Sequence, residues 1–241
     1  AFNFPCAVFF WNAAISMVAG NTQVWKPADS LTLTSVACTK IIADVLAAEK
    51  LPGAIASMIV GSGPTVGETM ISDPRMELVS FTGSTKVGRR VNEVVASRFG
   101  KRLLELGGNN AMIVDKDVNM DLALRATLFS AVGTAGQRCT SLRRLYVHEG
   151  VYEEFVDRLL KAYRTVKIGN PLEAGVLCGP LHNKAAVAQF ERAVAAVKEQ
   201  GGKLLAGGQR VDGLGNFVQP TVFETPTGAP MVKEEVFAPI L

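Results

Sequence analysis

The sequence has few of the side chains that metal centres, disulfide frameworks and serine–histidine enzymes require. It contains only two histidines, His148 and His182, and four cysteines, of which no two form a C-x-x-C pair. These numbers argue against a zinc site, a disulfide framework and a Ser-His mechanism. We therefore expect no metal, and a reducing compartment, either the cytoplasm or the mitochondrial matrix.

Strong charge and long apolar runs are also missing. The net charge is +3, from 25 basic and 22 acidic residues, and the longest basic clusters are the pairs Arg89-Arg90 and Arg143-Arg144, which we expect to be solvated or locally paired. No apolar run reaches the roughly 18 residues of a membrane span. The apolar stretch over residues 6–19 lacks the basic flank and cleavage site of a signal peptide. We expect neither a nucleic-acid nor a membrane partner, and a buried helix over residues 6–19.

Strands, glycine turns and helices alternate in the first half of the chain. With 48% hydrophobic and 20% charged residues, the composition is that of a globular protein. The apolar patterns predict strands over residues 55–60, 78–81 and 101–106, and helices over residues 30–49, capped by Ser30, and 85–97. This order is typical of an α/β fold with a parallel sheet, whose ligands bind at the carboxyl ends of the strands.

The second half, from about Asn109, contains similar elements. The patterns predict strands over residues 111–114, 145–147 and 203–206, helices over 120–132, 151–159 and 187–197, and a glycine-rich hairpin or loop over 207–215. The apolar-poor stretch over residues 133–141 interrupts this pattern. Both chain ends adjoin apolar segments without a leader or a polar tail, so we expect a piece cut from a longer polypeptide.

A cysteine stands beside an arginine in a glycine-bearing loop, with the sequence G-Q-R-C-T at residues 136–140. A nearby positive charge and backbone N–H groups favour the thiolate, which is the reactive form of cysteine. Cys139 is therefore a candidate nucleophile. On this motif alone, a buried structural cysteine is the more common alternative.

Two further motifs each have a functional and a structural interpretation. Glu105 stands between two leucines at a predicted strand end. A carboxylate in apolar surroundings holds a proton more readily, which suits a general base, although a solvent-facing glutamate is the simpler alternative. The sequence F-T-G-S-T over residues 81–85 places small residues and hydroxyls before a helix N-terminus, where phosphates bind; a plain turn with a helix cap fits it as well.

Together, six motifs resemble the aldehyde dehydrogenase superfamily, in the family's order and along essentially the whole chain. They are N-F-P at residues 3–5, W-K-P-A at 25–28, F-T-G-S-T-x-x-G at 81–88, E-L-G-G at 105–108, G-Q-x-C at 136–139 and E-x-F-[GA]-P at 235–239. The sequence E-L-G-G-N-N-A at residues 105–111 and the arginine at position 138 resemble the antiquitin branch, which oxidises α-aminoadipate semialdehyde in lysine breakdown.

The resemblance implies a fold and a reaction. The fold would be α/β and truncated at both ends, with a Rossmann-like part of the NAD-binding domain over residues 1–106 and part of the catalytic domain over residues 107–241. Cys139 would attack the aldehyde, and Glu105 would activate the water that hydrolyses the thioester. The Asn3 side-chain amide and the Cys139 N–H would form the oxyanion hole. The full-length protein would be a homo-oligomer, a tetramer by resemblance.

The resemblance also implies NAD as the cofactor. Asp29 would accept hydrogen bonds from the ribose and repel the 2′-phosphate of NADP, although the family more often has glutamate there. The implied cofactor contacts are Lys26, Asp29, Gly63, Pro64, Thr82, Gly83, Ser84, Leu106, Glu235 and Phe237. The alternative is ordinary surface charge for Lys26 and Glu235, and core packing for Phe237.

Two residues are implied on the substrate side, Arg138 and Phe4. The Arg138 guanidinium would pair with the substrate's carboxylate, or alternatively only favour the Cys139 thiolate. Other readings of the whole sequence are a general aliphatic or betaine aldehyde dehydrogenase, a coenzyme-A-acylating relative, and a non-catalytic protein that retains the fold. Glu105 favours hydrolysis, because acylating relatives typically lack this base. We expect the 241-residue piece alone to be inactive and poorly soluble.

Overall fold

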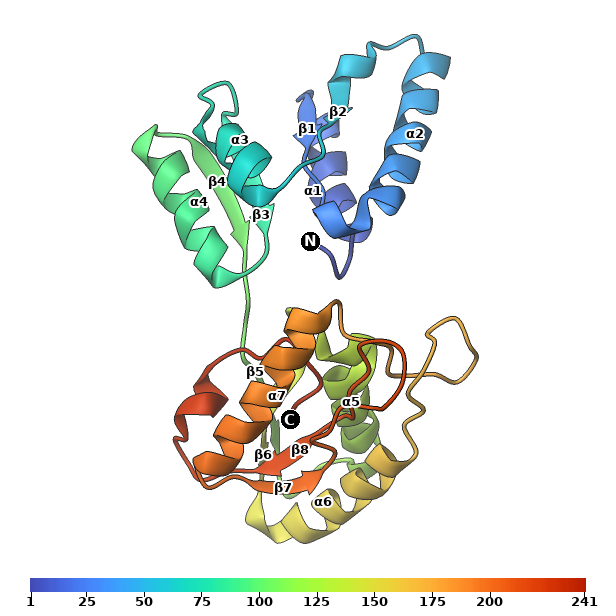
Figure 1. Ribbon diagram of the computed structural model, residues 1–241, viewed down its shortest axis with the longest axis vertical. Coiled ribbons are helices and arrows are strands. Elements are labelled where there is room, and N and C mark those ends of the chain that lie inside the picture. Colours follow the sequence, from blue (N-terminus) through green and yellow to red (C-terminus); the bar gives the residue numbers. More distant parts are fainter. The chain divides into compact units, whose positions relative to one another are not determined.

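The computed structural model describes residues 1–241, which form two compact units (Figure 1). Unit 1 comprises Ala1–Gly107 and unit 2 comprises Gly108–Leu241. The predicted division between residues 106 and 107 lies one residue away from this boundary. The assignment of unit 1 to cofactor binding and of unit 2 to catalysis stays a prediction.

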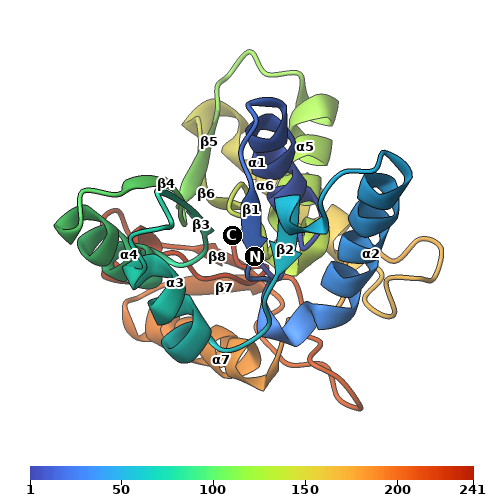
Figure 2. The ribbon, with the colours of Figure 1, turned by 90° about the horizontal axis from the view of Figure 1, so that it is seen from above.

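Unit 1 is an α/β arrangement of short parallel strand pairs and helices. Its helices are α1 (Ala7–Val18), α2 (Thr32–Ala48), α3 (Glu68–Ser72) and α4 (Thr85–Ser97), and its strands are β1 (Gln23–Trp25), β2 (Ala56–Met58), β3 (Leu78–Thr82) and β4 (Lys101–Glu105). β1 pairs with β2 and β3 with β4, both in parallel. α1 and α2 lie beside β1 and β2 (Figure 1), and α4 packs on β3 and β4 (Figure 2). The predicted strands and the parallel pairing are confirmed, whereas β1 was not predicted.

Helix α4 forms where its local signals place it. The Ser84 side chain caps the helix by accepting a hydrogen bond from the Val87 N–H, at 3.4 Å. Val91 and Val95, one turn apart, are buried with Ile71 in a small core under the helix. The strand–turn–helix unit over residues 78–97 therefore follows from short-range sequence features.

The predictions for α1 and for the start of α2 are partly wrong. α1 forms, but only Ala13 is buried in it, and Ile15 and Val18 are exposed because no other element of unit 1 covers that face. α2 begins at Thr32 rather than after a cap at Ser30, because a turn of 3-10 helix over Asp29–Leu31 precedes it.

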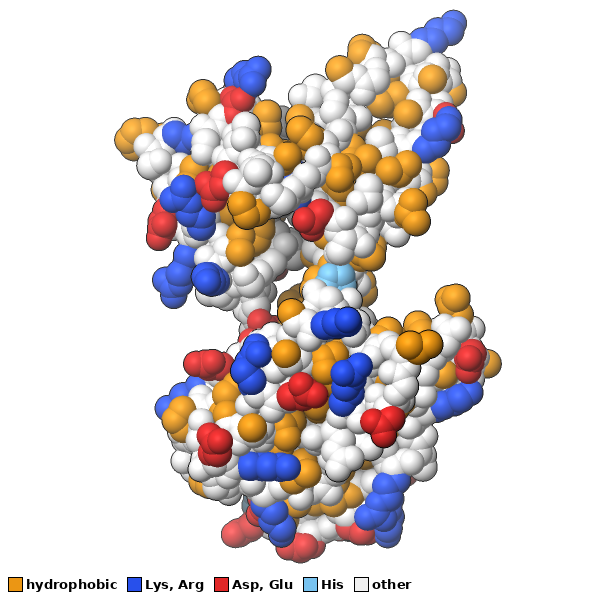
Figure 3. All heavy atoms as spheres, in the orientation of Figure 1, with side chains coloured by type: hydrophobic (Ala, Val, Ile, Leu, Met, Phe, Trp, Pro, Cys, Tyr) orange, Lys and Arg blue, Asp and Glu red, His pale blue; other side chains and the backbone are white.

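The apolar face of α2 points outward. The face that packs inward contains Ser35, Cys38 and Leu46, whereas the more apolar face with Leu33 and Ile41 is exposed. Figure 3 shows hydrophobic side chains over the surface that this helix forms. The helical stretch Asp29–Ala48 is long and apolar enough to cross a membrane by length and composition only; core helices of soluble proteins and signal sequences meet the same criteria.

Unit 2 combines a parallel and an antiparallel strand pair with three long helices. The helices are α5 (Met120–Val132), α6 (Glu149–Arg164) and α7 (Lys184–Glu199), and the strands are β5 (Asn110–Val114), β6 (Leu142–Val147), β7 (Lys203–Ala206) and β8 (Val222–Glu224). β5 and β6 are parallel, and β7 and β8 antiparallel. The predicted helices and strands are confirmed, and β8 was not predicted.

One continuous hydrophobic core holds unit 2 together. Phe155 and Leu159 of α6 and Phe190 of α7 are almost fully buried in it. The core also includes Val132 at the end of α5 and Leu142 at the start of β6. The segment between these two elements is thus anchored at both ends, and it contains the candidate nucleophile.

Candidate active site

Cys139 lies in the loop of residues 133–141 that joins α5 to β6, which we call the Cys139 loop. Three consecutive residues of this loop, Thr134, Ala135 and Gly136, have left-handed backbone angles, with φ of 57°, 51° and 66°. Each non-glycine residue in this region costs roughly 1–2 kcal/mol, so contacts around the loop must stabilise it. The Cys139 side chain is exposed, so it is not the buried structural cysteine that the motif alone allowed.

Two amide side chains anchor the Cys139 loop through hydrogen bonds. Asn110 Nδ2 donates to the carbonyl oxygens of Cys139, at 2.7 Å, and Ser141, at 2.9 Å. The Gln137 side chain is buried, donates to the Pro180 carbonyl at 3.2 Å and accepts from the backbone N–H of His182 at 2.8 Å. These contacts fix the backbone on both sides of the thiol.

The segment of residues 235–238 packs against the Cys139 loop. A Cβ added to Gly136 would lie 2.4 Å from the carbonyl carbon of Ala238, so only glycine permits this approach. Glu235 is half-buried and pairs with Arg143, at 3.3 Å between Nη2 and Oε1. The centre of the Phe237 ring lies 5.4 Å from the Arg143 guanidinium carbon. Two predicted cofactor contacts thus adjoin the Cys139 loop within unit 2.

Arg138 is held by its own neighbours. Its Nε donates to the Thr134 hydroxyl at 2.7 Å, and its guanidinium carbon lies 4.9 Å from the centre of the Phe129 ring. A cation over an aromatic ring is attracted by the ring's negative face. The side chain is therefore preorganised next to Cys139, where a guanidinium can pair with an anion.

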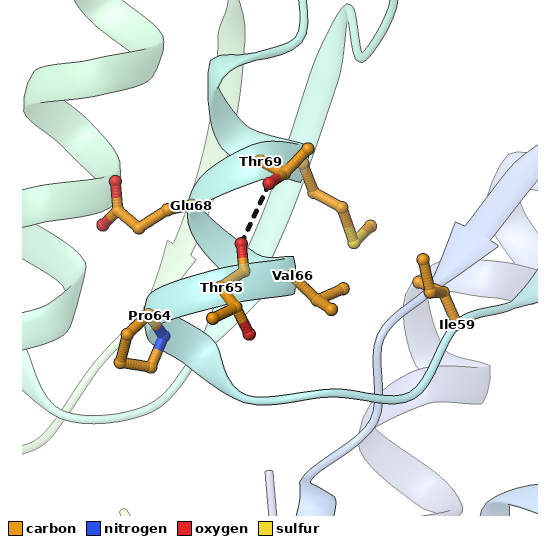
Figure 4. Close-up of a pocket in the computed structure, with 7 residues that line it drawn as sticks. Ile59, Pro64, Thr65, Val66, Glu68 and Thr69 are labelled. Carbon is orange, nitrogen blue, oxygen red and sulfur yellow. Dashed lines mark hydrogen bonds between the residues drawn. The ribbon is translucent and has the colours of Figure 1, made fainter.

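Most of the other predicted cofactor contacts lie in unit 1. Gly63 and Pro64 begin a turn of π-helix (residues Gly63–Gly67) that runs into α3. An open pocket of about 500 Å³ is lined there by Ile59, Pro64, Thr65, Val66, Glu68, Thr69 and Met70 (Figure 4). Its lining is mostly apolar, which suits a flat aromatic ring such as adenine. Lys26 follows β1, and its ammonium donates to the Pro27 carbonyl at 2.9 Å.

The phosphate-type turn lies at the end of β3. Thr82 ends the strand, the Gly83 N–H donates to the Glu105 carbonyl at 3.0 Å, and Ser84 caps α4. A Cβ on Gly88 would lie 2.3 Å from the Leu106 side chain, so this glycine lets α4 approach Leu106. The turn therefore places a helix N-terminus at the carboxyl ends of two parallel strands, where anions bind.

The remaining predicted residues of unit 1 lie at element ends. Glu105 ends β4 and is exposed, so unit 1 by itself does not provide the apolar enclosure expected from its neighbouring leucines. Asp29 begins the 3-10 turn before α2. Asn3 and Phe4 are half-buried just before α1.

Comparison with known proteins identifies the family. The sequence matches the aldehyde dehydrogenase family over residues 1–241. The chain belongs to the aldehyde dehydrogenase family. The predicted resemblance is thereby confirmed, including its branch: α-aminoadipic semialdehyde dehydrogenase of Mus musculus is 53% identical over 245 residues, covering 100% of this chain and 45% of that protein.

Solved structures confirm the predicted fold class. Lactaldehyde dehydrogenase from Escherichia coli aligns with a TM-score of 0.95 at 34% identity, over 100% of this chain and 50% of that one. Betaine aldehyde dehydrogenase from Staphylococcus aureus, in complex with NAD⁺, aligns with a TM-score of 0.91 at 29% identity, over 96% of this chain and 46% of that one. This aldehyde dehydrogenase chain spans about half the length of the relatives it matches.

Within the aldehyde dehydrogenase fold, unit 2 brings Cys139, Arg138, Glu235 and Phe237 together. Asn3 and Glu105 belong to unit 1, so their convergence on Cys139 stays a prediction. The residues that support the Cys139 loop were not among the predicted ones. Asn110 lies in the E-L-G-G-N-N motif, which was a usable signal, whereas Arg143 was expected to be solvated or locally paired and is instead buried.

Proposed function

We propose that the complete protein carrying this sequence is an NAD-dependent dehydrogenase that oxidises α-aminoadipate semialdehyde to the carboxylic acid. The observation that carries the proposal is the exposed Cys139 on a strained loop held by Asn110, in a chain that matches the family throughout. The 53% identity to a protein named α-aminoadipic semialdehyde dehydrogenase supports the choice of substrate.

The proposed chemistry begins at the thiol. The Cys139 thiolate attacks the aldehyde carbon, a C–S bond forms, and the carbonyl electrons move to oxygen as an oxyanion. The Cys139 N–H and the Asn3 amide would donate to that oxyanion, and removing one such donor typically costs roughly 3–4 kcal/mol of barrier. After oxidation to the thioester, Glu105 takes a proton from water; the hydroxide attacks, the C–S bond breaks, and the acid leaves.

The residues of unit 1 fit a dinucleotide. The apolar pocket beside Pro64 matches an adenine ring, and the capped N-terminus of α4 at Ser84 matches a pyrophosphate. Asp29 and Lys26 would hold the adenosine ribose, and Glu235 and Phe237 the nicotinamide end. When bound, NAD⁺ supplies the hydride acceptor for the oxidation. The NAD⁺ complex of the betaine aldehyde dehydrogenase supports this cofactor choice.

Two variants test the reaction. Cys139→Ser should abolish NADH formation. Glu105→Gln should allow one burst of NADH per active site and then stall at the thioester, because hydrolysis lacks its base. Steady turnover by Glu105→Gln at the wild-type rate would contradict the hydrolytic role of Glu105. If the wild-type protein released its product from Cys139 only when coenzyme A was added, that result would favour an acylating relative. A thiol at Cys139 that neither NAD nor aldehyde protects from labelling would favour a non-catalytic protein.

Arg138 tests the substrate. We expect Arg138→Ala to raise KM for α-aminoadipate semialdehyde far more than for a simple aliphatic aldehyde, because only the first carries a carboxylate for the guanidinium. Equal effects on both substrates would exclude Arg138 as the anchor of the substrate's carboxylate and favour a general aliphatic or betaine aldehyde dehydrogenase.

Light scattering of the complete protein would test the proposed homotetramer.

A further inference from the structure

Arg143, at the start of β6, is among the most buried charged side chains of the chain, with a side-chain exposure of 4%. Its two terminal nitrogens donate to backbone carbonyls of two different segments. The acceptors in the Cys139 loop are Gly136, at 3.2 Å from each nitrogen, and Arg138, at 3.0 Å. The acceptors in the segment 235–238 are Val236, at 2.6 Å, and Ala238, at 3.5 Å. A single guanidinium therefore bridges the two segments.

The charge of Arg143 is also partly compensated from both segments. Burial lowers the pKa of Arg143, and the Glu235 carboxylate and, more weakly, the Cys139 sulfur oppose this effect. Its Nε is buried without a hydrogen-bond partner. Burying a charge and leaving a polar atom unsatisfied are both costly, so the arrangement calls for a physical explanation.

We propose that Arg143 is a positioning residue that links the Cys139 loop to the segment 235–238. This link would hold the Cys139 thiol at a constant position relative to the cofactor contacts of that segment. This proposal rests on the proposed function, because it takes Glu235 and Phe237 as contacts to the nicotinamide end. The planar guanidinium suits this role, since it presents several donors in one fork, whereas a lysine ammonium acts as a single point.

The neighbouring Arg144 provides a matched control. It lies on the same strand and has the same side chain, but its Nε donates to the Asn109 carbonyl, at 2.9 Å, outside both segments. A change at Arg144 should therefore leave the link between the loop and the segment intact.

The test compares Arg143→Lys, Arg143→Gln and Arg144→Gln in the complete protein. Active sites are titrated so that kcat is given per reactive thiol, and melting temperatures report folding. We expect Arg143→Lys to lower kcat at least tenfold and to raise KM for NAD severalfold, and Arg144→Gln to stay within twofold of wild type. Values for Arg143→Lys within twofold of wild type, or an equal loss in Arg144→Gln, would overturn the proposal.

A second measurement needs no turnover. Cys139 and Cys6 are both exposed and should react with iodoacetamide, so the Cys6 rate in unit 1 serves as an internal reference. We expect Arg143→Gln, which loosens the link between the Cys139 loop and the segment 235–238, to change the Cys139 labelling rate at least fivefold relative to that of Cys6. An unchanged ratio, or loss of folded protein in both Arg143 variants, would assign Arg143 to fold stability alone. A wild type that oxidises no aldehyde would instead count against the proposed function, and the labelling ratio would still test Arg143.

Discussion

Replacing Gly136 by alanine should destabilise unit 2 and displace the Cys139 loop. Its φ of +66° costs an alanine roughly 1–2 kcal/mol. The added Cβ would also lie 2.4 Å from both the carbonyl carbon and oxygen of Ala238, so backbone must move. Movement weakens the hydrogen bonds of Arg143 to these residues, each worth about 1 kcal/mol. We expect a total loss of about 3–5 kcal/mol in the free energy of unfolding.

Gly175→Ala is the matched control. Gly175 has a similar φ of +79°, but nothing lies within 4 Å of an added Cβ, so only the backbone cost of roughly 1–2 kcal/mol remains. The two variants therefore separate the steric contribution from the conformational one.

The assay must report on unit 2 alone. Both tryptophans, Trp11 and Trp25, lie in unit 1, so their fluorescence is unsuitable. Cys178 is fully buried in unit 2, and its burial raises the pKa of the thiol to about 12. Its alkylation against urea concentration, followed by mass spectrometry, gives the unfolding midpoint of this unit. If the losses in the free energy of unfolding caused by Gly136→Ala and Gly175→Ala agree within about 1 kcal/mol, the clash with Ala238 does not contribute to the destabilisation, and the close packing of Gly136 against Ala238 is refuted as its cause.

Two further predictions concern burial. In the native protein iodoacetamide should modify Cys6 and Cys139 quickly and spare Cys38 and Cys178, which are buried; early modification of Cys178 would contradict the packing of unit 2. Phe155→Ala should lower the stability of unit 2 by about 3–5 kcal/mol, because this fully buried ring would leave a cavity; a loss below about 1 kcal/mol in the same urea assay would be inconsistent with the core.

Local elements were predictable where local signals are complete. Helix α4 has a serine cap, a periodic apolar face and a glycine turn before it, and it forms over the predicted residues. β1 and β8 were missed because each is three residues long and, unlike β2 in the apolar run of residues 55–60, has no longer apolar run around it; each is a strand only through its pairing with β2 or β7. A segment this short has too few residues for an alternating pattern.

Burial was less predictable than secondary structure. The apolar sequence of α1 indicated a buried helix, yet Ile15 and Val18 are exposed, because burial depends on what other elements cover a face. The same reason applies to Glu105, whose leucine neighbours suggested an enclosure that the strand end does not provide. Sequence neighbours of a residue need not be its spatial neighbours.

The family, the order of the motifs and the candidate nucleophile could be read from the residues alone, because these depend on residue identity at given positions. The contacts that hold Cys139, in contrast, became visible only in the folded chain. The Val236 carbonyl that accepts from Arg143 lies 93 residues away along the chain. A backbone carbonyl is present at every residue, so no residue type marks it as an acceptor; packing alone brings it to the guanidinium.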